Sequence, residues 1–433
     1  MKRLAVALLL ASVSAPAFAQ ASHDTLFDAV DSAMANNPEL MAQRKTRAVA
    51  DEVLNQAKAQ MGPQIGLQGS YGTSDLSFGR SISTPVGTFP LDGVQQKATL
   101  GLEARQSIYS GGALTAQRDQ AKAGVDASQA QLVGAEQQLV LSVVTAFVDV
   151  RRAEQEVEIR ETNVNSLKQE VQASKDRFQV GEVTRTDVAQ AQAREAGAEG
   201  DLARSRSTLA TARATYERVV GRPPLQLAEP PPAPQLPGTV EEAISIAQGA
   251  NPDIVAARAQ EAAAAKGVGI AVGNLRPKVG LVGSAGLQDT YKDNSFQDTN
   301  VGLSAEFSIP LFQSGLLNSK KRGAQLEADK ARYQRMAVER EVSARVTSAW
   351  HQVIAARESI AASSSRVEAA KTALEGAQQE LAVGTRITLD VLDQERELLE
   401  AQLGLVDSQR AAYIATHQLL AAMGRLSADQ IGH

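Results

Sequence analysis

The chain is a duplication: one succession of sequence signals occurs twice, and this limits its fold more than any other feature. Asn37-Pro38 recurs as Asn251-Pro252, an offset of 214 residues (251 − 37). Val180-Gly181 recurs as Val383-Gly384, an offset of 203 residues (384 − 181). Repetition at fixed offsets indicates that both halves build the same structural unit.

Each half contains one very long helical pattern without proline, at 113–180 and at 316–382. Large apolar residues recur there every seven positions, mostly with a small residue three places later, which is typical of a heptad seam between closely packed helices. Each helix would be roughly 100 Å long at about 1.5 Å per residue. The large positions are Val143, Val150, Val157, Val164, Val171 and Phe178, and then Val346, Val353, Ile360, Val367, Leu374 and Leu381.

The hydrophobic period changes from helical to two at about 64–107 and again at about 278–309, which predicts a β-hairpin in each half. Each strand has about ten alternating residues, enough to cross a membrane at a tilt. The polar faces carry Glu103, Arg105 and Glu306, which would line either a pore or the solvent side of a soluble sheet. Four strands cannot close a barrel, and lipid does not tolerate open edges, so a membrane role requires several copies of the chain.

The chain divides into four predicted parts. Residues 1–19 have the basic start, apolar run and small-residue cleavage site of a secretory signal; an uncleaved membrane anchor is the alternative, but the run is short for that. Residues 20–221 form the first repeat, 222–238 a proline-rich linker and 239–433 the second repeat. In each repeat the two shorter helices, stacked end to end, match the long one, which predicts a rod with a hairpin at one end and a Val-Gly turn at the other.

Composition argues against catalysis and against nucleic acid. The chain has no cysteine, and its four histidines are scattered, so we expect no metal site, no catalytic histidine and no cofactor. No nucleophile–base arrangement or phosphate loop is evident, so we expect no enzyme. A formal net charge of −5 without a basic patch argues against nucleic acid as a partner.

Acidic residues follow the Val-Gly turn in both halves. Asp187 follows the first turn, and Asp390 with Asp393 follows the second. Acidic residues near helix starts are favoured by the helix dipole wherever they occur. The alternative is functional: symmetric copies of the chain would gather these carboxylates into rings, which set cation selectivity in pores. Arg386 lies beside them and could pair with Asp187 of the neighbouring half.

The chain resembles the TolC-like outer-membrane efflux and secretion channels over essentially its whole mature length. The most specific match is Val383-Gly384-Thr385-Arg386 followed by Leu389-Asp390-Val391-Leu392-Asp393. The resemblance implies a mainly α fold with a β-barrel part. It implies a homotrimer in the outer membrane of a Gram-negative bacterium, with twelve strands in one barrel and the helices in a hollow periplasmic α-barrel. It further implies a passive exit duct that works with a periplasmic adaptor and an inner-membrane ABC or proton-driven transporter.

The resemblance also implies roles for single residues. Asp390 and Asp393 match the acidic rings of the periplasmic entrance, and Arg386 matches the arginine that latches the closed state. Leu381 departs from the pattern, because some members carry a gating tyrosine there. Thr186 and Asp187 match the partners of the latch, and the adaptor-docking turns correspond to Val180, Gly181, Val383 and Gly384.

The kind of cargo stays open at this point. The C-terminal run 417–426 is similar to members that serve type I protein secretion, whereas small-molecule efflux is the other role of the family. A different class of function fits the long heptads equally well, namely a periplasmic coiled-coil adaptor or scaffold without a pore. That alternative does not explain strands of membrane length at matching places in both halves.

Overall fold

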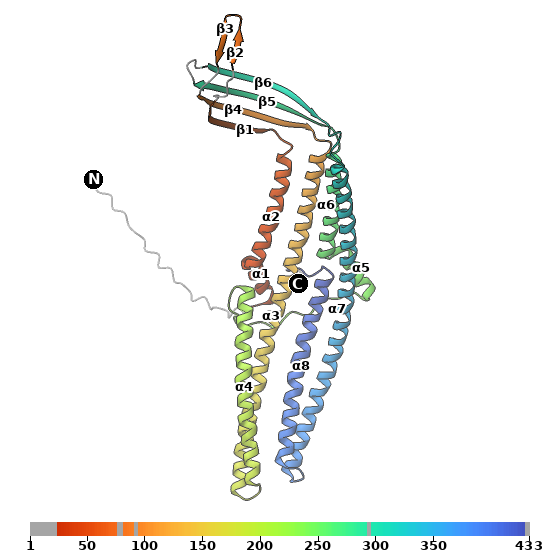
Figure 1. The fold of residues 1–433 in the computed structure, drawn as a ribbon. Helices are drawn as coiled ribbons and strands as arrows, with labels where there is room; N and C mark the ends of the chain where they lie inside the picture. The colour runs from red at the N-terminus through yellow and green to blue at the C-terminus, as the bar shows by residue number, and fades with distance from the viewer. Residues whose placement is uncertain (1–23, 76–80, 91–93, 292–295, 429–433) are drawn as a thin grey trace, which may run out of the picture.

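The computed structural model describes residues 24–75, 81–90, 94–291 and 296–428, so the predicted signal at 1–19 lies outside the described residues. A β-sheet occupies one end of a long molecule, and helices run from it to two turns at the other end (Figure 1). The helices are α1 (Leu26–Asn36), α2 (Pro38–Ala59), α3 (Ala113–Gln179), α4 (Arg185–Val220), α5 (Val240–Ala250), α6 (Pro252–Gly273), α7 (Leu316–Ala382) and α8 (Thr388–Ala422).

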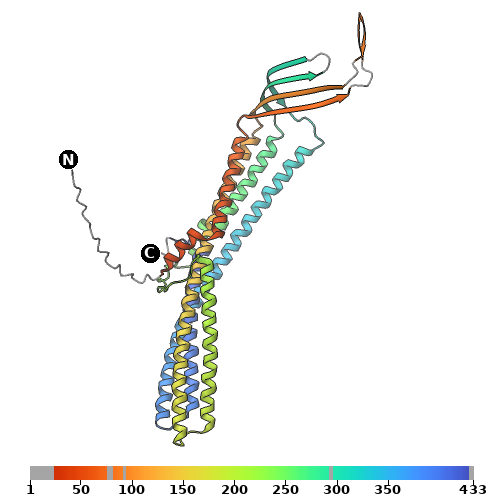
Figure 2. The same ribbon diagram turned by 90° about the vertical axis from the view of Figure 1, so that its left-hand side faces the viewer.

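The duplication is present in the helices of the structure. Helices α2 and α6 have 22 residues each, and α3 and α7 have 67 each. In each half the long helix lies beside two shorter ones stacked along it, so the predicted rod is confirmed (Figures 1 and 2). The predicted long helices at 113–180 and 316–382 differ from the observed ones by at most one residue.

Four antiparallel strands form the sheet in the order β1-β4-β5-β6. They are β1 (Gln64–Asp75), β4 (Val94–Tyr109), β5 (Lys278–Tyr291) and β6 (Phe296–Ser308). The loop expected between the first two strands contains a further hairpin, β2 (Ser81–Thr84) with β3 (Gly87–Pro90), which the sequence analysis missed. Its strands have four residues each, too few for alternation to stand out from a Gly- and Pro-rich loop.

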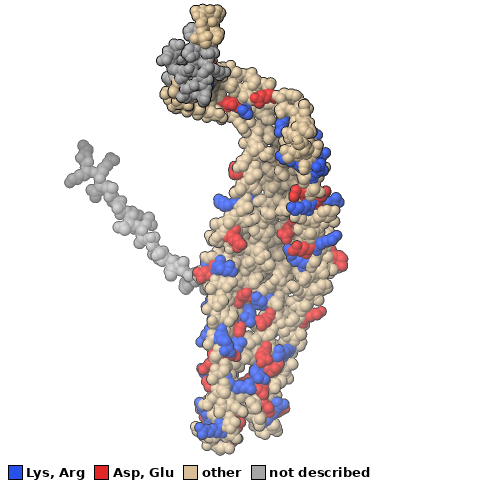
Figure 3. All heavy atoms as spheres, in the orientation of Figure 1, with Lys and Arg blue, Asp and Glu red and all other residues tan. Residues whose placement is uncertain are grey.

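One face of the sheet is apolar. Leu67, Leu102, Ala285 and Val301 are neighbours in register and form one row across all four strands. Leu67 is 67 % exposed and Val301 is 82 % exposed, so this row is uncovered in the single chain. Charged side chains are spread along the helices, whereas few lie on the visible part of the sheet (Figure 3). An uncovered apolar sheet of this kind marks a surface that meets lipid or another protein.

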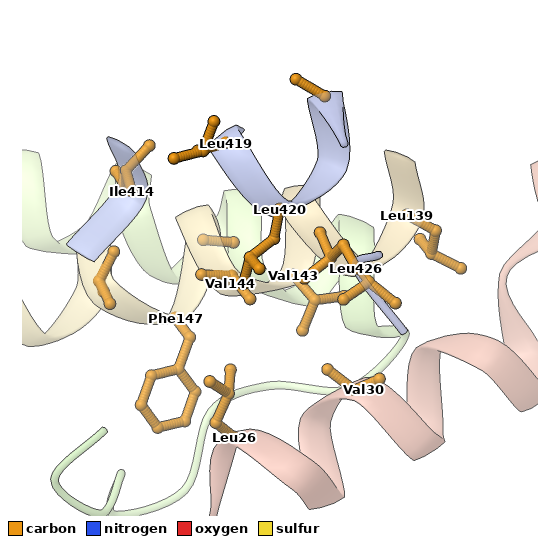
Figure 4. Close-up of a cluster of buried hydrophobic side chains, with 14 of the residues drawn as sticks. Leu26, Val30, Leu139, Val143, Val144, Phe147, Ile414, Leu419, Leu420 and Leu426 are labelled. Carbon is orange, nitrogen blue, oxygen red and sulfur yellow. The ribbon is translucent and has the colours of Figure 1, made fainter. Parts of the chain in front are cut away.

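The main core lies halfway along the rod, where the stacked helices meet. Leu26 and Val30 of α1 pack there against Val143 and Phe147 of α3, with Leu420 of α8 closing the cluster (Figure 4). Part of α3 is apolar and long enough to cross a membrane by length and composition alone. In the structure, the buried α3 residues 139–150 belong to this core, which accounts for their apolar character.

The heptad seam holds only where a helix has a partner on that side. Val164 and Val171 are buried in a smaller cluster with α4, but Phe178 is 46 % exposed near the turn. In α7 the seam is buried at Val346 and Val353 and only half-buried at Leu374. A heptad sets the phase of a helix face, but burial also requires a neighbouring element.

Asparagine joins the stacked helices at the level of the core. Asn251 caps α6, since its side-chain oxygen accepts from Asp253 N at 2.9 Å, and its Nδ2 donates to the carbonyl of Ala422 at the end of α8 at 2.8 Å. Asn37 makes the equivalent bonds in the first half, with Glu39 N and with the carbonyl of Val219. Each asparagine therefore satisfies the start of one helix and the end of another.

We predict that Asn251→Ala destabilises the protein by about 1–3 kcal/mol, because a helix cap and a buried hydrogen bond are lost together. The measurement is the midpoint of thermal unfolding by circular dichroism in detergent. Asn36→Ala is the control, because the exposed Asn36 side chain donates to Ser32 O of its own helix and does not join two helices in the described part of the chain. Equal midpoints for the two variants would contradict this role of Asn251.

Candidate functional site at the helix turns

Two helix turns lie together at the end of the molecule opposite the sheet (Figures 1 and 2). Gly181 has φ 83° between α3 and α4, and Gly384 has φ 79° between α7 and α8, a conformation that favours glycine. Glu182 N donates to Arg177 O and Thr385 N donates to Glu380 O, both at 2.9 Å, so both turns close the same way.

Both turns present an apolar side chain to solvent. Val180 is 71 % exposed and Val383 is 74 % exposed. A Cβ added at either glycine would have no atom within 4 Å. Two open valine-glycine surfaces of the same shape therefore lie side by side.

The helices that leave these turns start differently. Thr184 and Asp187 form a capping box on α4: Asp187 N donates to Thr184 Oγ1, and Asp187 Oδ2 accepts from Thr184 N at 2.8 Å. Helix α8 begins after Ile387, which has no side-chain oxygen to cap it. Within the described ranges, no hydrogen bond or ion pair engages the carboxylate of Asp390, the repeat equivalent of Asp187 (390 − 187 = 203).

Asp393 bridges the two helical hairpins. Its Oδ1 accepts from Arg194 Nη2 of α4 at 2.8 Å. The adjacent Leu392 is buried against α3 and α4. Asp393 and Asp390 were expected to act together, but in the described part of the chain Asp393 pairs with Arg194 and Asp390 has no such partner. The sequence pattern did not single out Arg194, because its pairing with Asp393 depends on how the two hairpins pack.

The expected pair of Arg386 with Asp187 is not formed within the chain. Arg386 pairs instead with Glu380, which lies across the same turn. Asp187 belongs to the other hairpin and is engaged by Thr184. Thr186 is exposed at the second residue of α4. The latch residues therefore lie at one end of the molecule without meeting in the single chain.

A pair of buried carboxylates lies between α3 and α8, and the sequence analysis did not single it out. Glu170 Oε1 and Glu395 Oε2 are buried without a hydrogen-bond partner in the described part of the chain. Burial, and then the negative charge of Glu170, raises the pKa of Glu395 to about 7. Burial also raises the pKa of Glu170, against the opposing effect of Arg177. The sequence signal for this burial was the helical spacing: Glu395 lies three residues after Leu392 and therefore on the same side of α8.

The charged groups next to Glu395 lie on α3, α4 and α8, and α7 contributes an ion pair to α8 nearby in the sequence. Helix α3 contributes Glu170, and the cavity of about 220 Å³ that Glu395 lines also contains Arg194 and Asp201 of α4 and Arg396 of α8. On α7, Arg366 pairs with Glu397. No set of three His, Cys, Asp or Glu side chains within the described ranges is placed to hold a metal ion. The site is therefore built from helix ends, ion pairs and exposed valines.

Comparison with known proteins identifies the family. The family model described as "Outer membrane efflux protein" matches residues 29–222 and 243–425. Outer membrane efflux protein BepC of Brucella suis is 33 % identical over 432 residues, covering 100 % of this chain and 92 % of BepC. Outer membrane protein TolC of Escherichia coli is 26 % identical over 451 residues, covering 100 % of this chain and 88 % of TolC.

A solved structure shares the fold. The outer membrane protein VceC of Vibrio cholerae superimposes with a TM-score of 0.78 at 24 % sequence identity, over 92 % of this chain and 96 % of VceC. The expected fold class is thus confirmed: long duplicated helical hairpins joined to strands that form part of an outer-membrane barrel. Together with the family match over both repeats, these findings place the protein in the outer membrane of a Gram-negative bacterium, from which it extends into the periplasm. The chain belongs to the outer membrane efflux protein family.

Proposed function

We propose that the chain works as a homotrimer in which three sheets close one twelve-stranded barrel. One observation carries this proposal: the sheet has an uncovered apolar face and two edge strands, β1 and β6. Edges left open in lipid are costly, and four strands are too few to close alone. Three copies give twelve strands, and the polar faces with Glu103 and Glu306 then line a water-filled duct. Outer-membrane lipid is the partner of the apolar face.

The duct conducts passively from the periplasm to the outside. The proposal assigns no catalytic residue, cofactor or nucleic-acid partner to the chain, and the energy comes from an inner-membrane transporter. The exposed Val180 and Val383 with their glycines form the surface on which a periplasmic adaptor docks. The name of the relative BepC supports efflux as the use of the duct. A pore-free scaffold has no need of the uncovered apolar sheet.

The helix turns form the periplasmic entrance. Helix α8 is held against the α3–α4 hairpin by the Arg194–Asp393 ion pair and by Leu392. Opening requires these contacts to separate, which is a shift between two populations of helix positions. In the trimer the unengaged Asp390 carboxylates form an acidic ring, and Arg386 with Thr186 and Asp187 lies at the same level. The division into repeats 20–221 and 239–433, with a signal at 1–19 and a linker at 222–238, is part of this proposal.

Arg194→Gln is expected to open the entrance, since it removes the pair with Asp393. A partly exposed ion pair is worth about 0–1 kcal/mol, so the open-to-closed ratio rises by up to about fivefold per chain. The readout is single-channel conductance in planar bilayers. Arg206→Gln is the matched control, because Arg206 pairs with Glu161 inside the α3–α4 hairpin at 2.8 Å. Arg386→Ser should change conductance less than Arg194→Gln, since its partner Glu380 lies across the same turn. Equal conductance of Arg194→Gln and Arg206→Gln would refute the gate role.

For Asp390→Ala we expect a weaker preference for cations, because a ring of carboxylates attracts cations at the entrance. The reversal potential in a KCl gradient measures this preference. Asp31→Ala, an exposed substitution on α1 halfway along the rod, removes the same charge and should leave the potential unchanged. A reversal potential that Asp390→Ala does not move would overturn the acidic-ring assignment.

We predict that the stability of the protein depends on pH through the Glu395 carboxyl. Its folded pKa is raised, so between about pH 4.5 and 7 the folded chain keeps a proton that the unfolded chain has lost. The contribution to stability is complete below the unfolded pKa and is lost as the pH rises through 7. Glu395→Gln removes this loss and should be about 1–2 kcal/mol more stable than the wild type at pH 8, after allowance for partial solvent screening, and close to it at pH 5.

The test of the Glu395 prediction is thermal unfolding in detergent at pH 5 and pH 8. Glu158→Gln, an exposed substitution on α3, controls for the loss of one negative charge. A wild type and a Glu395→Gln variant with the same pH dependence would show that Glu395 is not held protonated.

A further inference from the structure

Helices α2 and α7 each lack a neighbour that their repeat equivalents have. Helix α6 packs against both α3 and α7, whereas α2 packs against α3 and, among the residues that the structure describes, has no second long helix beside it. The helices lie in the order α2, α3, α6, α7 across the layer, so α2 and α7 are its two edges (Figure 1). The repeat equates α3 with α7 and α6 with α2, so the α3–α6 contact has its counterpart between α7 and α2.

The α3–α6 contact combines an ion pair with a fit of sizes. Lys266 Nζ of α6 lies 3.4 Å from Asp119 Oδ2 of α3. Gln120 of α3 donates to the carbonyl of Ala263, and a Cβ built on Gly267 would lie 3.3 Å from Gln120 Nε2. The long side chain of Gln120 thus occupies the space that Gly267 leaves open.

The repeat equivalents of these four residues are complementary with both roles exchanged. Asp119 becomes Arg322 (119 + 203), and Lys266 becomes Glu52 (266 − 214), so the acidic and basic sides change places. Gln120 becomes Gly323 (120 + 203), and Gly267 becomes Val53 (267 − 214), so the large and small sides change places as well.

The apolar surface agrees with a missing neighbour at these positions. Val53 of α2 is 48 % exposed, while Leu326 and Tyr333 of α7 are 68 % and 69 % exposed. The α3 equivalents of the last two, Ala123 and Ala130, are buried. Faces that are buried in one repeat are therefore uncovered in the other, at the same register.

We propose that α7 of one chain packs against α2 of a second copy, with Arg322 facing Glu52 and with Val53 seated over Gly323. The proposal rests on the trimer of the proposed function and goes beyond it by naming the contact and its register. The contact joins two different surfaces, so successive copies add in one direction and close a ring. Pairing of α2 with α2 or of α7 with α7 would instead bring like charges together.

Engineered cysteines test the contact directly, because the natural chain has no cysteine. Glu52→Cys with Arg322→Cys should give a covalently linked trimer on oxidation, with a linked dimer as the intermediate, on a denaturing gel. Asp119→Cys with Arg322→Cys is the control and should give no linked species, because the two positions lie on different long helices separated by α6.

Charge exchange gives a second readout. Glu52→Arg or Arg322→Glu alone should lower the trimer-to-monomer ratio by about two- to fivefold per contact, the range of an exposed ion pair. The two substitutions together should restore the ratio. Size-exclusion chromatography with light scattering in mild detergent measures it, and circular dichroism checks that each variant is folded.

The outcomes separate this contact from the trimer itself. A trimer by light scattering that the two cysteines do not link would overturn the α2–α7 contact and leave the proposed function standing. A monomeric wild type would overturn both. Linked dimers that never proceed to trimers would show contacts between like surfaces and would overturn the ring closure.

Discussion

The rest of this structure depends on one constraint: in lipid, the edge strands of a sheet need hydrogen-bonding partners. A sheet with edges β1 and β6 and an uncovered apolar face is incomplete in one chain. In the proposed trimer, closure by three copies limits how far the helices below can spread, because they continue directly from the strands. The proposed duct, its ring of turns and its entrance all depend on a sheet that is incomplete in one chain.

Because of the duplication, one chain supplies two helical rods to such a tube. The two rods have similar helices but different side chains on their outer faces. Asn37 and Asn251 join the stacked helices in the same way in both halves, because each bonds to the end of the neighbouring helix. The two halves nevertheless differ in sequence at particular positions of the repeat. Asp187 caps its helix while Asp390 does not, and the pair Asp119–Lys266 has its charges exchanged in Arg322 and Glu52. These departures from the repeat distinguish the contacts within the chain from the proposed contact between chains.

Periodicity predicted most of the fold because it is a local property of the sequence. The proline-free helical pattern with its heptad seam predicted α7 at 316–382, and alternation predicted the strands. Periodicity does not show which residue a side chain contacts. Phe178 continues the heptad and is nonetheless exposed, and Arg386 pairs with Glu380 instead of Asp187. The burial of Glu395 and the pairing of Asp393 with Arg194 depend on how the two hairpins pack, which no local pattern encodes.

Copies of this chain are proposed to close into one hollow tube with the sheet in the membrane and the helix turns far from it. Electron microscopy of the purified protein in lipid nanodiscs tests this most directly. We expect a three-fold particle with a twelve-stranded barrel in the disc and a continuous helical tube that ends about 100 Å below it, by the helix rise per residue. A particle with separate sheets, or with helices that enclose no channel, would contradict the closed tube.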